Sequence, residues 1–358
     1  MATATDLSIQ TLILTAYEVG ASDLFIKVGV PPMIKQYSFV RPLPGDWPVL
    51  TEDVVTNLLN GLMSERQRRR FEEHMEMDLA FQIGDTCRVR TNIYMQRTTP
   101  ASVMRIIPMK IRTLEELGLP NVLGEVTKHR QGLVLVTGPT GSGKTTTLAA
   151  LIDIINQQRQ CHIVTVEDPL EITHVDKQAY LSQREVGIDT EDFQPALRAV
   201  VREAPDVILI GEMRDVITMN VALQAGETGH LVFSTVHTAS AYETLDRVIN
   251  MFPPHEKIHL CQRMANSLKA IVAQKLVPRI DGGRVVANEI LIVTPTVQKA
   301  IEDGHFGDIY PLMNDGAFWG MQTMNQSLAK YVKAGIVAED VALSYAGVVS
   351  ELKQLLRQ

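Results

Sequence analysis

Directly after the apolar run 133–137, the sequence contains a glycine-rich octapeptide: Gly138-Pro139-Thr140-Gly141-Ser142-Gly143-Lys144-Thr145. It matches every fixed position of the phosphate-loop pattern G-x-x-x-x-G-K-[ST], and a helical stretch, 145–155, follows it. In such a strand–loop–helix unit, backbone N–H groups and the helix N-terminus surround phosphate oxygens. The lysine reaches the terminal phosphates, and the threonine hydroxyl lies on Mg²⁺. We therefore expect residues 138–145 and the adjoining Thr146 to bind ATP together with Mg²⁺.

The pattern of apolar runs after residue 131 predicts an α/β domain. Runs at 133–137, 163–166, 207–210 and 231–236 alternate with helical segments, as in a parallel sheet that helices cover on both faces. We expect this domain, 131–358, to be doubly wound and mainly parallel, with its ligand at the carboxyl ends of the strands. A final strand, 284–293, precedes C-terminal helices. The last of these, 345–357, is expected to pack against its own chain.

The N-terminal part, 1–107, has the pattern of a smaller mixed α/β domain. Its periodicity predicts a helix at 7–19, a strand at 23–27, one helix from 51 to about 73, and strands between 78 and 107. The segment 108–130 contains Pro108 and Pro120 around a short helical stretch. We expect this segment to be the linker between the two domains.

Composition argues against several classes of protein. The chain has 358 residues, 45% of them hydrophobic, which is enough for two cores. Its three cysteines, Cys87, Cys161 and Cys261, form no C-x-x-C pair, so neither a zinc knuckle nor a disulfide framework is expected. A basic and apolar leader and a run of 18 apolar residues are both missing, which predicts a cytoplasmic protein without direct membrane insertion. The net charge of −7 argues against nucleic-acid binding.

Acidic residues follow two of the predicted strands at the end where the phosphates should lie. The strand 163–166 continues into Glu167, Asp168 and Glu171, and we expect one of these carboxylates to be the base that activates water. The strand 207–210 ends in Gly211-Glu212, as a Walker B element does, and Glu212 is expected to act on Mg²⁺ through water. The expected metal-binding residues are Thr145, Glu212 and Glu167.

Histidines bracket the predicted strand 231–236, and arginines accumulate in the N-terminal domain. Because His230 and His237 are seven residues apart, one unbroken strand points them to opposite faces. At most one of them then faces the γ-phosphate, unless the strand bends or ends between them. The context favours His237. The stretch 88–105 carries arginines that are suited to reach a triphosphate in a neighbouring subunit, although surface salt bridges explain each of them nearly as well: Arg88, Arg90, Arg97 and Arg105.

Several motifs together are similar to those of the secretion-ATPase superfamily, and within it to type IV pilus retraction ATPases of the PilT/PilU kind. They are Gly20-Ala21-Ser22-Asp23-Leu24, the phosphate loop, the acidic segment 167–171, Gln183-Arg184-Glu185-Val186-Gly187, Gly211-Glu212-Met213-Arg214-Asp215, the histidine segment 230–237, and Gly320-Met321-Gln322-Thr323. The resemblance extends over nearly the whole chain. It implies a PAS-like N-terminal domain and a RecA-like ATPase domain, assembled as a homohexamer. ATP hydrolysis would then power pilus retraction and twitching motility at an inner-membrane platform protein.

The same resemblance implies roles for particular residues. The implied catalytic set is Glu171 as the base, Glu212 as the Walker B acid, His230 and His237 of the histidine box, and Arg90, Arg97 and Arg105 acting across the subunit interface. Extension and type II secretion relatives usually carry a tetracysteine zinc element, so the three dispersed cysteines favour retraction.

Two alternatives remain. The segments 204–207 and 270–278 are closer to PilU, which implies an accessory subunit that needs a second retraction ATPase. A nucleic-acid translocase on the same RecA-like core is the alternative from a different class.

Overall fold

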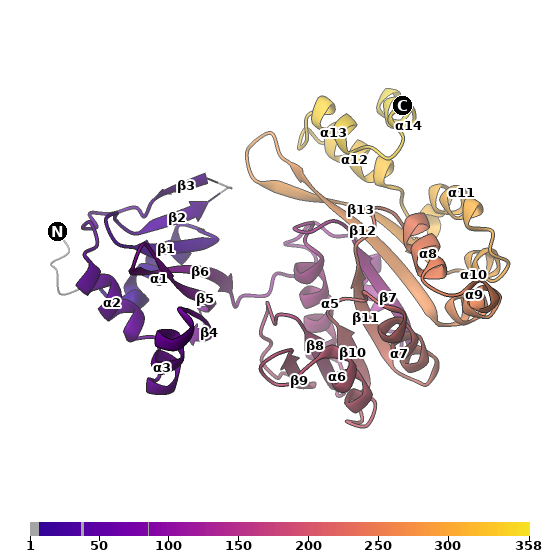
Figure 1. Cartoon of the computed structure of the whole chain (residues 1–358). Coiled ribbons are helices and arrows are strands. Elements are labelled where there is room, and N and C mark those ends of the chain that lie inside the picture. Colours follow the sequence, from indigo (N-terminus) through magenta and orange to yellow (C-terminus); the bar gives the residue numbers. More distant parts are fainter. Residues whose placement is uncertain (1–6, 37–38, 85) are drawn as a thin grey trace. The chain divides into compact units, whose positions relative to one another are not determined.

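The computed structural model describes residues 7–36, 39–84 and 86–358, which form two compact units, Met1–Lys110 and Ile111–Gln358 (Figure 1). None of the helices in these ranges combines the length and apolar character that crossing a bilayer requires. The end of the first unit lies close to the expected boundary. The segment 111–130, however, is not a free linker, because it contributes buried side chains to a core of the second unit: Leu114, Leu119, Leu123 and Val126.

The first unit contains an antiparallel sheet whose described strands lie in the order β3-β2-β1-β6-β5-β4. The strands are β1 (Asp23–Lys27), β2 (Met33–Gln36), β3 (Phe39–Pro42), β4 (Glu76–Ile83), β5 (Cys87–Gln96) and β6 (Thr99–Pro108). The helices are α1 (Ile9–Glu18), α2 (Glu52–Asn60) and α3 (Glu65–His74). Leu12 of α1 and Leu59 of α2 pack with Leu24, Val89 and Met104 of the sheet, so these helices cover one face of it.

The expectation of one helix over 51–73 is wrong, because the chain forms α2 and α3 instead. Gly61 ends α2, and Ser64 begins α3. The Ser64 hydroxyl accepts a hydrogen bond from the Gln67 N–H, and the Gln67 side chain accepts one from the Ser64 N–H at 2.9 Å. This capping box starts a new helix after the break, and its S-x-x-Q spacing is visible in the sequence.

The second unit is built on a larger sheet with the described strand order β13-β12-β7-β11-β10-β8-β9. All neighbours from β12 to β9 are parallel, and β13 is antiparallel to β12. The strands are β7 (Gly132–Thr137), β8 (His162–Glu167), β9 (Tyr180–Glu185), β10 (Val207–Ile210), β11 (Leu231–Val236), β12 (Leu268–Pro278) and β13 (Arg284–Ile292). The expectation of a mainly parallel α/β sheet is therefore confirmed.

Helices lie on both faces of this sheet (Figure 1). One core contains side chains of α6 (Phe193–Val200), α7 (Val216–Glu227), α8 (Ala241–Asn250), α9 (Lys257–Ser267), α10 (Pro295–Glu302) and α11 (Ile309–Asn314), and the other contains those of α4 (Val122–Val126) and α5 (Lys144–Gln158). Sheet residues alternate between these cores: Leu133 and Leu135 face the first, whereas Val134 and Val136 face the second.

The expected strands 133–137, 163–166, 207–210, 231–236 and 284–293 correspond to β7, β8, β10, β11 and β13. The strands β9 and β12 were not predicted from the sequence. β9 lies at the edge of the sheet, where among the described strands it pairs with β8 alone, and it has no continuous apolar run. β12, which is long and largely buried, lies beside β7 and carries the antiparallel hairpin to β13.

The C-terminal helices are α12 (Met324–Lys333), α13 (Glu339–Tyr345) and α14 (Val349–Arg357), and short 3₁₀ turns occur at Pro254–Glu256, Phe306–Asp308 and Ala317–Trp319. The last helix begins at Val349 rather than at 345. Leu352 is fully buried, and Leu355 and Leu356 pack against the same cluster as Leu328 of α12. The expectation that this helix packs on its own chain is confirmed.

Candidate functional site

The predicted phosphate loop connects β7 to α5 through a turn that requires glycine. Gly138 has φ 143°, and a Cβ atom there would lie 2.5 Å from the Gln274 carbonyl oxygen of β12 and 2.5 Å from Ser142 Oγ. Gly143, with φ 92°, is the residue before α5. The loop therefore packs closely on β12, and the N-terminus of α5 opens where an anion would lie.

The Lys144 side chain lies over this loop and is largely buried. Its ammonium donates to the carbonyl oxygens of Gly138 at 2.8 Å and of Pro139 at 3.1 Å. Burial lowers the pKa of Lys144, and the negative charges of Glu212 and Glu171 oppose that shift. The Lys144 ammonium is therefore held in place by the loop, near the carboxylates of Glu212 and Glu171.

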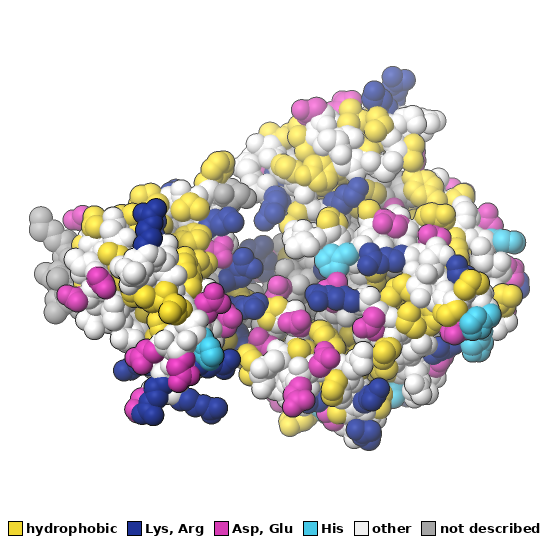
Figure 2. Space-filling view, viewed as in Figure 1, with side chains coloured by type: hydrophobic (Ala, Val, Ile, Leu, Met, Phe, Trp, Pro, Cys, Tyr) yellow, Lys and Arg dark blue, Asp and Glu magenta, His cyan; other side chains and the backbone are white. Residues whose placement is uncertain are grey.

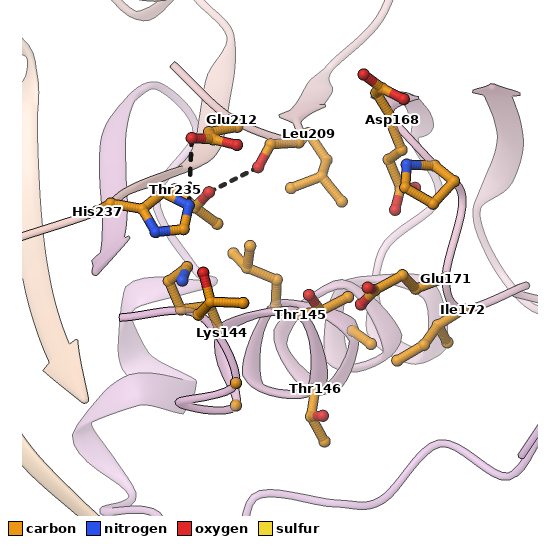
Figure 3. Close-up of a pocket in the computed structure, with 18 of the residues that line it drawn as sticks. Lys144, Thr145, Thr146, Asp168, Glu171, Ile172, Leu209, Glu212, Thr235 and His237 are labelled. Carbon is orange, nitrogen blue, oxygen red and sulfur yellow. Dashed lines mark hydrogen bonds and ion pairs between the residues drawn. The ribbon is translucent and has the colours of Figure 1, made fainter. Parts of the chain in front are cut away.

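The loop borders a cavity of about 560 Å³ at the carboxyl ends of the parallel strands (Figure 3). The predicted site residues that line it are Thr140, Gly141, Gly143, Lys144, Thr145, Thr146, Glu167, Glu171, Glu212 and His237. In Figure 3, Glu212 and His237 lie on one side and Asp168 and Glu171 on the other, with α5 between them. Pro139 and Ser142 line an adjoining pocket instead.

Glu212 is the centre of an ion-pair network at the end of β10. Its Oε2 accepts from Arg214 Nε at 2.9 Å, and its Oε1 lies 3.2 Å from His237 Nε2. Burial alone would raise the pKa of Glu212, but the hydrogen bond and charge of Arg214, with the charges of His237 and Lys144, lower it below the usual value. Glu212 is therefore ionised and oriented. The hydroxyl of Thr235 donates to the Gly211 carbonyl at 2.8 Å and ties β11 to this turn.

Glu167 differs from the other carboxylates because it is buried at the end of β8. Burial raises its pKa to about 7, and hydrogen bonds from Thr165 and Gln183 only partly oppose the shift. A carboxyl group with this pKa is about half protonated at neutral pH, which makes it a weaker metal ligand than Glu212.

Glu171 is exposed within the cavity, on the segment that follows β8. Two polar side chains hold that segment. The Gln183 amide on β9 donates to the Ile172 carbonyl at 3.0 Å, and the Asn156 amide on α5 donates to the Val175 carbonyl at 2.8 Å. These contacts position Glu171 opposite Thr145 (Figure 3).

Within the described ranges, no group of three His, Cys, Asp or Glu side chains has the arrangement of an all-protein metal site. Thr145 and Glu212 nevertheless line the same cavity. Mg²⁺ usually keeps several waters and binds one or two side chains together with substrate phosphates. The residues present fit that mode of binding, with Thr145 and Glu212 as the protein partners.

His230, unlike His237, does not line this cavity. It precedes β11, whereas His237 follows it, so the two histidines lie at opposite ends of the strand. His230 Nδ1 lies 3.0 Å from the Ala225 carbonyl oxygen at the end of α7. The expectation that one strand points the two histidines to opposite faces does not apply, because neither histidine belongs to the six-residue strand β11.

The predicted arginines all lie in the first unit. Arg90 of β5 is directly opposite Arg105 of β6, so both point to the face of the sheet away from α1 and α2. Arg105 Nε lies 3.2 Å from Asp23 Oδ1, and Arg97 occupies the turn between the two strands. Both Arg90 and Arg97 are exposed.

Arg214 and His174 line the cavity but were not predicted as site residues from the sequence. Arg214 follows Glu212 by two residues, and that spacing could have identified it as a partner. His174 is buried, and its Nδ1 has no hydrogen-bond partner among the described residues. Burial lowers the pKa of His174 to about 4, with the charge of Asp153 opposing the shift and that of Lys177 adding to it. Nothing in the sequence marks it as buried.

The pKa of His174 predicts a pH-dependent stability. The folded state keeps this imidazole neutral, whereas the unfolded chain protonates it below about pH 6.5. We expect the free energy of unfolding to fall by about 3 kcal/mol as the pH drops from 6.5 to 4, beyond the change seen in a His174→Gln variant. Urea unfolding of both proteins across this range measures the difference. Parallel pH profiles would contradict a neutral, buried His174.

Comparison with known proteins agrees with this arrangement. The family model of the type II/IV secretion system protein matches residues 62–305. The type IV pilus retraction ATPase PilT of Pseudomonas aeruginosa is 42% identical over 96% of this chain and 99% of its own length. The type IV pilus ATPase PilU of the same organism is 39% identical over 95% of this chain and 89% of its own length. A crystal structure of the pilus retraction motor PilT with bound ADP superposes with a TM-score of 0.89 at 40% identity, covering 98% of this chain and all of the other. The chain therefore belongs to the type II/IV secretion system protein family, within the group that contains the type IV pilus retraction ATPases.

Proposed function

We propose that this protein is an ATPase that powers type IV pilus retraction. The observation that carries the proposal is that Lys144, Glu171 and Glu212 line one cavity at the carboxyl ends of parallel strands. This cavity belongs to a chain that is 42% identical to a pilus retraction ATPase over nearly its whole length. A cation, an exposed carboxylate and an oriented carboxylate are the groups that hydrolysis of a triphosphate requires.

Each side chain has a role that its surroundings support. When nucleotide binds, the Lys144 ammonium leaves the carbonyl oxygens of the loop and contacts the terminal phosphates instead. Glu171, which is exposed and lies opposite Thr145, is the base that takes a proton from the attacking water. Glu212 holds His237 on the γ-phosphate side, and it orients water around the cation. Mg²⁺, when bound, would neutralise charge on the β- and γ-phosphates.

The assembly that we propose is a homohexamer of RecA-like and PAS-like domains. In such a ring, Arg90, Arg97 and Arg105 approach the nucleotide of a neighbouring subunit, and His230 acts from outside the cavity of its own chain. The adjacent exposed guanidinium groups of Arg90 and Arg105 support this, because no acidic residue lies opposite Arg90 in β4 or β6. We place the ring in the cytoplasm at an inner-membrane platform protein.

The experiment that tests the ATPase function is phosphate release by the purified chain with ATP and Mg²⁺, in the presence and absence of single- and double-stranded DNA and RNA. We expect turnover that nucleic acid does not stimulate. Basic and acidic side chains are interspersed on the visible face of the protein (Figure 2), and the net charge is −7. Stimulation of several-fold by DNA or RNA would instead support a translocase.

A second candidate is an accessory subunit that works with another retraction ATPase. The observation in its favour is the 39% identity to PilU over 95% of the chain. Turnover that appears only after a second retraction ATPase is added would support this role. Full turnover by the isolated chain would exclude it.

A further inference from the structure

A buried carboxylate outside the cavity, Glu289, joins two helices that belong to different parts of the second unit. It lies on β13 and is only 3% exposed. Across the sheet, Glu289 pairs with Ala273 of β12, and Ala273 pairs with Thr137, the last residue before the phosphate loop. Glu289 is therefore at the level of the site but is separated from it by β12 and β7.

The first of the two helices is α8, which follows the histidine segment. The Ala241 N–H at the start of α8 donates to Glu289 Oε1 at 2.8 Å. Two contacts tie the segment between His237 and α8 to that helix: Arg247 donates to the His237 carbonyl at 2.8 Å, and the hydroxyls of Thr238 and Thr244 lie 2.7 Å apart. His237 in turn contacts Glu212. These contacts connect His237 to the start of α8.

The second helix is α12, which begins beside the free edge of β13 (Figure 1). Ile290, the residue after Glu289, pairs with Gln322 just before this helix through backbone hydrogen bonds of 2.8 and 3.2 Å. Burial raises the pKa of Glu289, and the nearby N–H of Met324, the first residue of α12, opposes that shift. The next residue, Asn325, donates to the Val348 carbonyl at 2.9 Å and to Glu351 Oε2 at 3.1 Å, and accepts from the Gly347 N–H at 3.1 Å. The first turn of α12 thus holds α14.

We propose that Glu289 is a positioning residue that couples His237 in the nucleotide site to the C-terminal helices α12 to α14. A carboxylate is the side chain suited to this position, because it accepts from the N-terminus of α8 and its charge is also favourable beside the N-terminus of α12. Glutamine has the same length but no charge, so it weakens the connection to both helix N-termini. This coupling rests on the proposed ATPase function.

The test is a double-mutant cycle between Glu289→Gln and His237→Ala, read as kcat and KM for ATP. We expect Glu289→Gln to lower kcat about tenfold while KM changes by less than about twofold. In the His237→Ala background it should lower kcat no further, because the residue acts through His237. A matched control is Ser327→Ala, which removes the acceptor of the Asn288 N–H between β13 and α12 without touching α8, and which should leave kcat unchanged.

Three outcomes would overturn the coupling: wild-type kcat in Glu289→Gln, an equal loss in Ser327→Ala, or additive losses in the double variant. If Glu289→Gln is insoluble, Glu289→Asp, which shortens the side chain, replaces it in the same cycle with the same expectations. A second readout needs no turnover. ATP should slow hydrogen exchange at the first turn of α12 in the wild type but not in Glu289→Gln, so equal protection would also overturn the coupling. A wild-type chain that binds ATP without hydrolysing it would contradict the proposed ATPase function but not the coupling.

Discussion

Replacing Lys144 with alanine is expected to lower ATP turnover by about 10²- to 10³-fold, because the phosphates lose their buried positive partner. The variant also loses the hydrogen bonds from Lys144 to the carbonyls of Gly138 and Pro139, so the loop itself loses a support. ATP affinity should fall with turnover. Phosphate release and calorimetric titration with ATP measure the two effects separately.

The control for the lost charge is Lys128→Ala. Lys128 is exposed and pairs with Glu125 on the surface, where such ion pairs contribute little. We expect turnover of this variant to match the wild type. Turnover of Lys144→Ala within about twofold of the control would mean that the loop is not the phosphate site.

Replacing Glu171 with glutamine is expected to have an effect of a different kind. Turnover should fall by about 10²- to 10⁴-fold, since the amide cannot take a proton from water. ATP affinity should stay within about threefold of the wild type, because Glu171 acts in the transition state and not in ground-state binding. A Glu171→Gln variant that still binds ATP but no longer hydrolyses it would identify Glu171 as the base.

Asp168→Asn is the matched control for Glu171→Gln. Asp168 lines the same cavity, is exposed as Glu171 is, and loses the same charge when replaced. We expect it to retain most of its turnover. A large loss in Asp168→Asn with near-normal turnover in Glu171→Gln would move the base to Asp168 and refute our assignment.

The sequence alone predicted the parts of the fold that depend on local pattern. Four buried parallel strands have continuous apolar runs, and the phosphate loop has an invariant spacing, so both are visible without a structure. The strand β9 has no such run, and the break between α2 and α3 depends on a capping box inside a region of helical periodicity. Hydrophobic periodicity does not show either feature, because β9 depends on its pairing with β8 and the start of α3 depends on hydrogen bonds of its capping box.

The site was predictable to a similar extent. Residues that follow a strand end, such as Glu171, Glu212 and His237, converge because parallel strands end at one edge. Burial decides the rest. Glu167 has a pKa of about 7 and His174 one of about 4 because each is enclosed by residues distant in the sequence. Glu289 accepts from the start of α8 and lies beside the start of α12, and these two helices begin far apart in the chain, at residues 241 and 324.

The measurement that tests the central claim most directly is a count of surface pili by electron microscopy, with a score of twitching motility, in cells whose only copy of this protein carries Lys144→Ala. A retraction ATPase that cannot hydrolyse ATP leaves extension running, so we expect more pili than in the wild type together with lost motility. Cells without pili would show that the protein drives extension or assembly, and would contradict the proposed function.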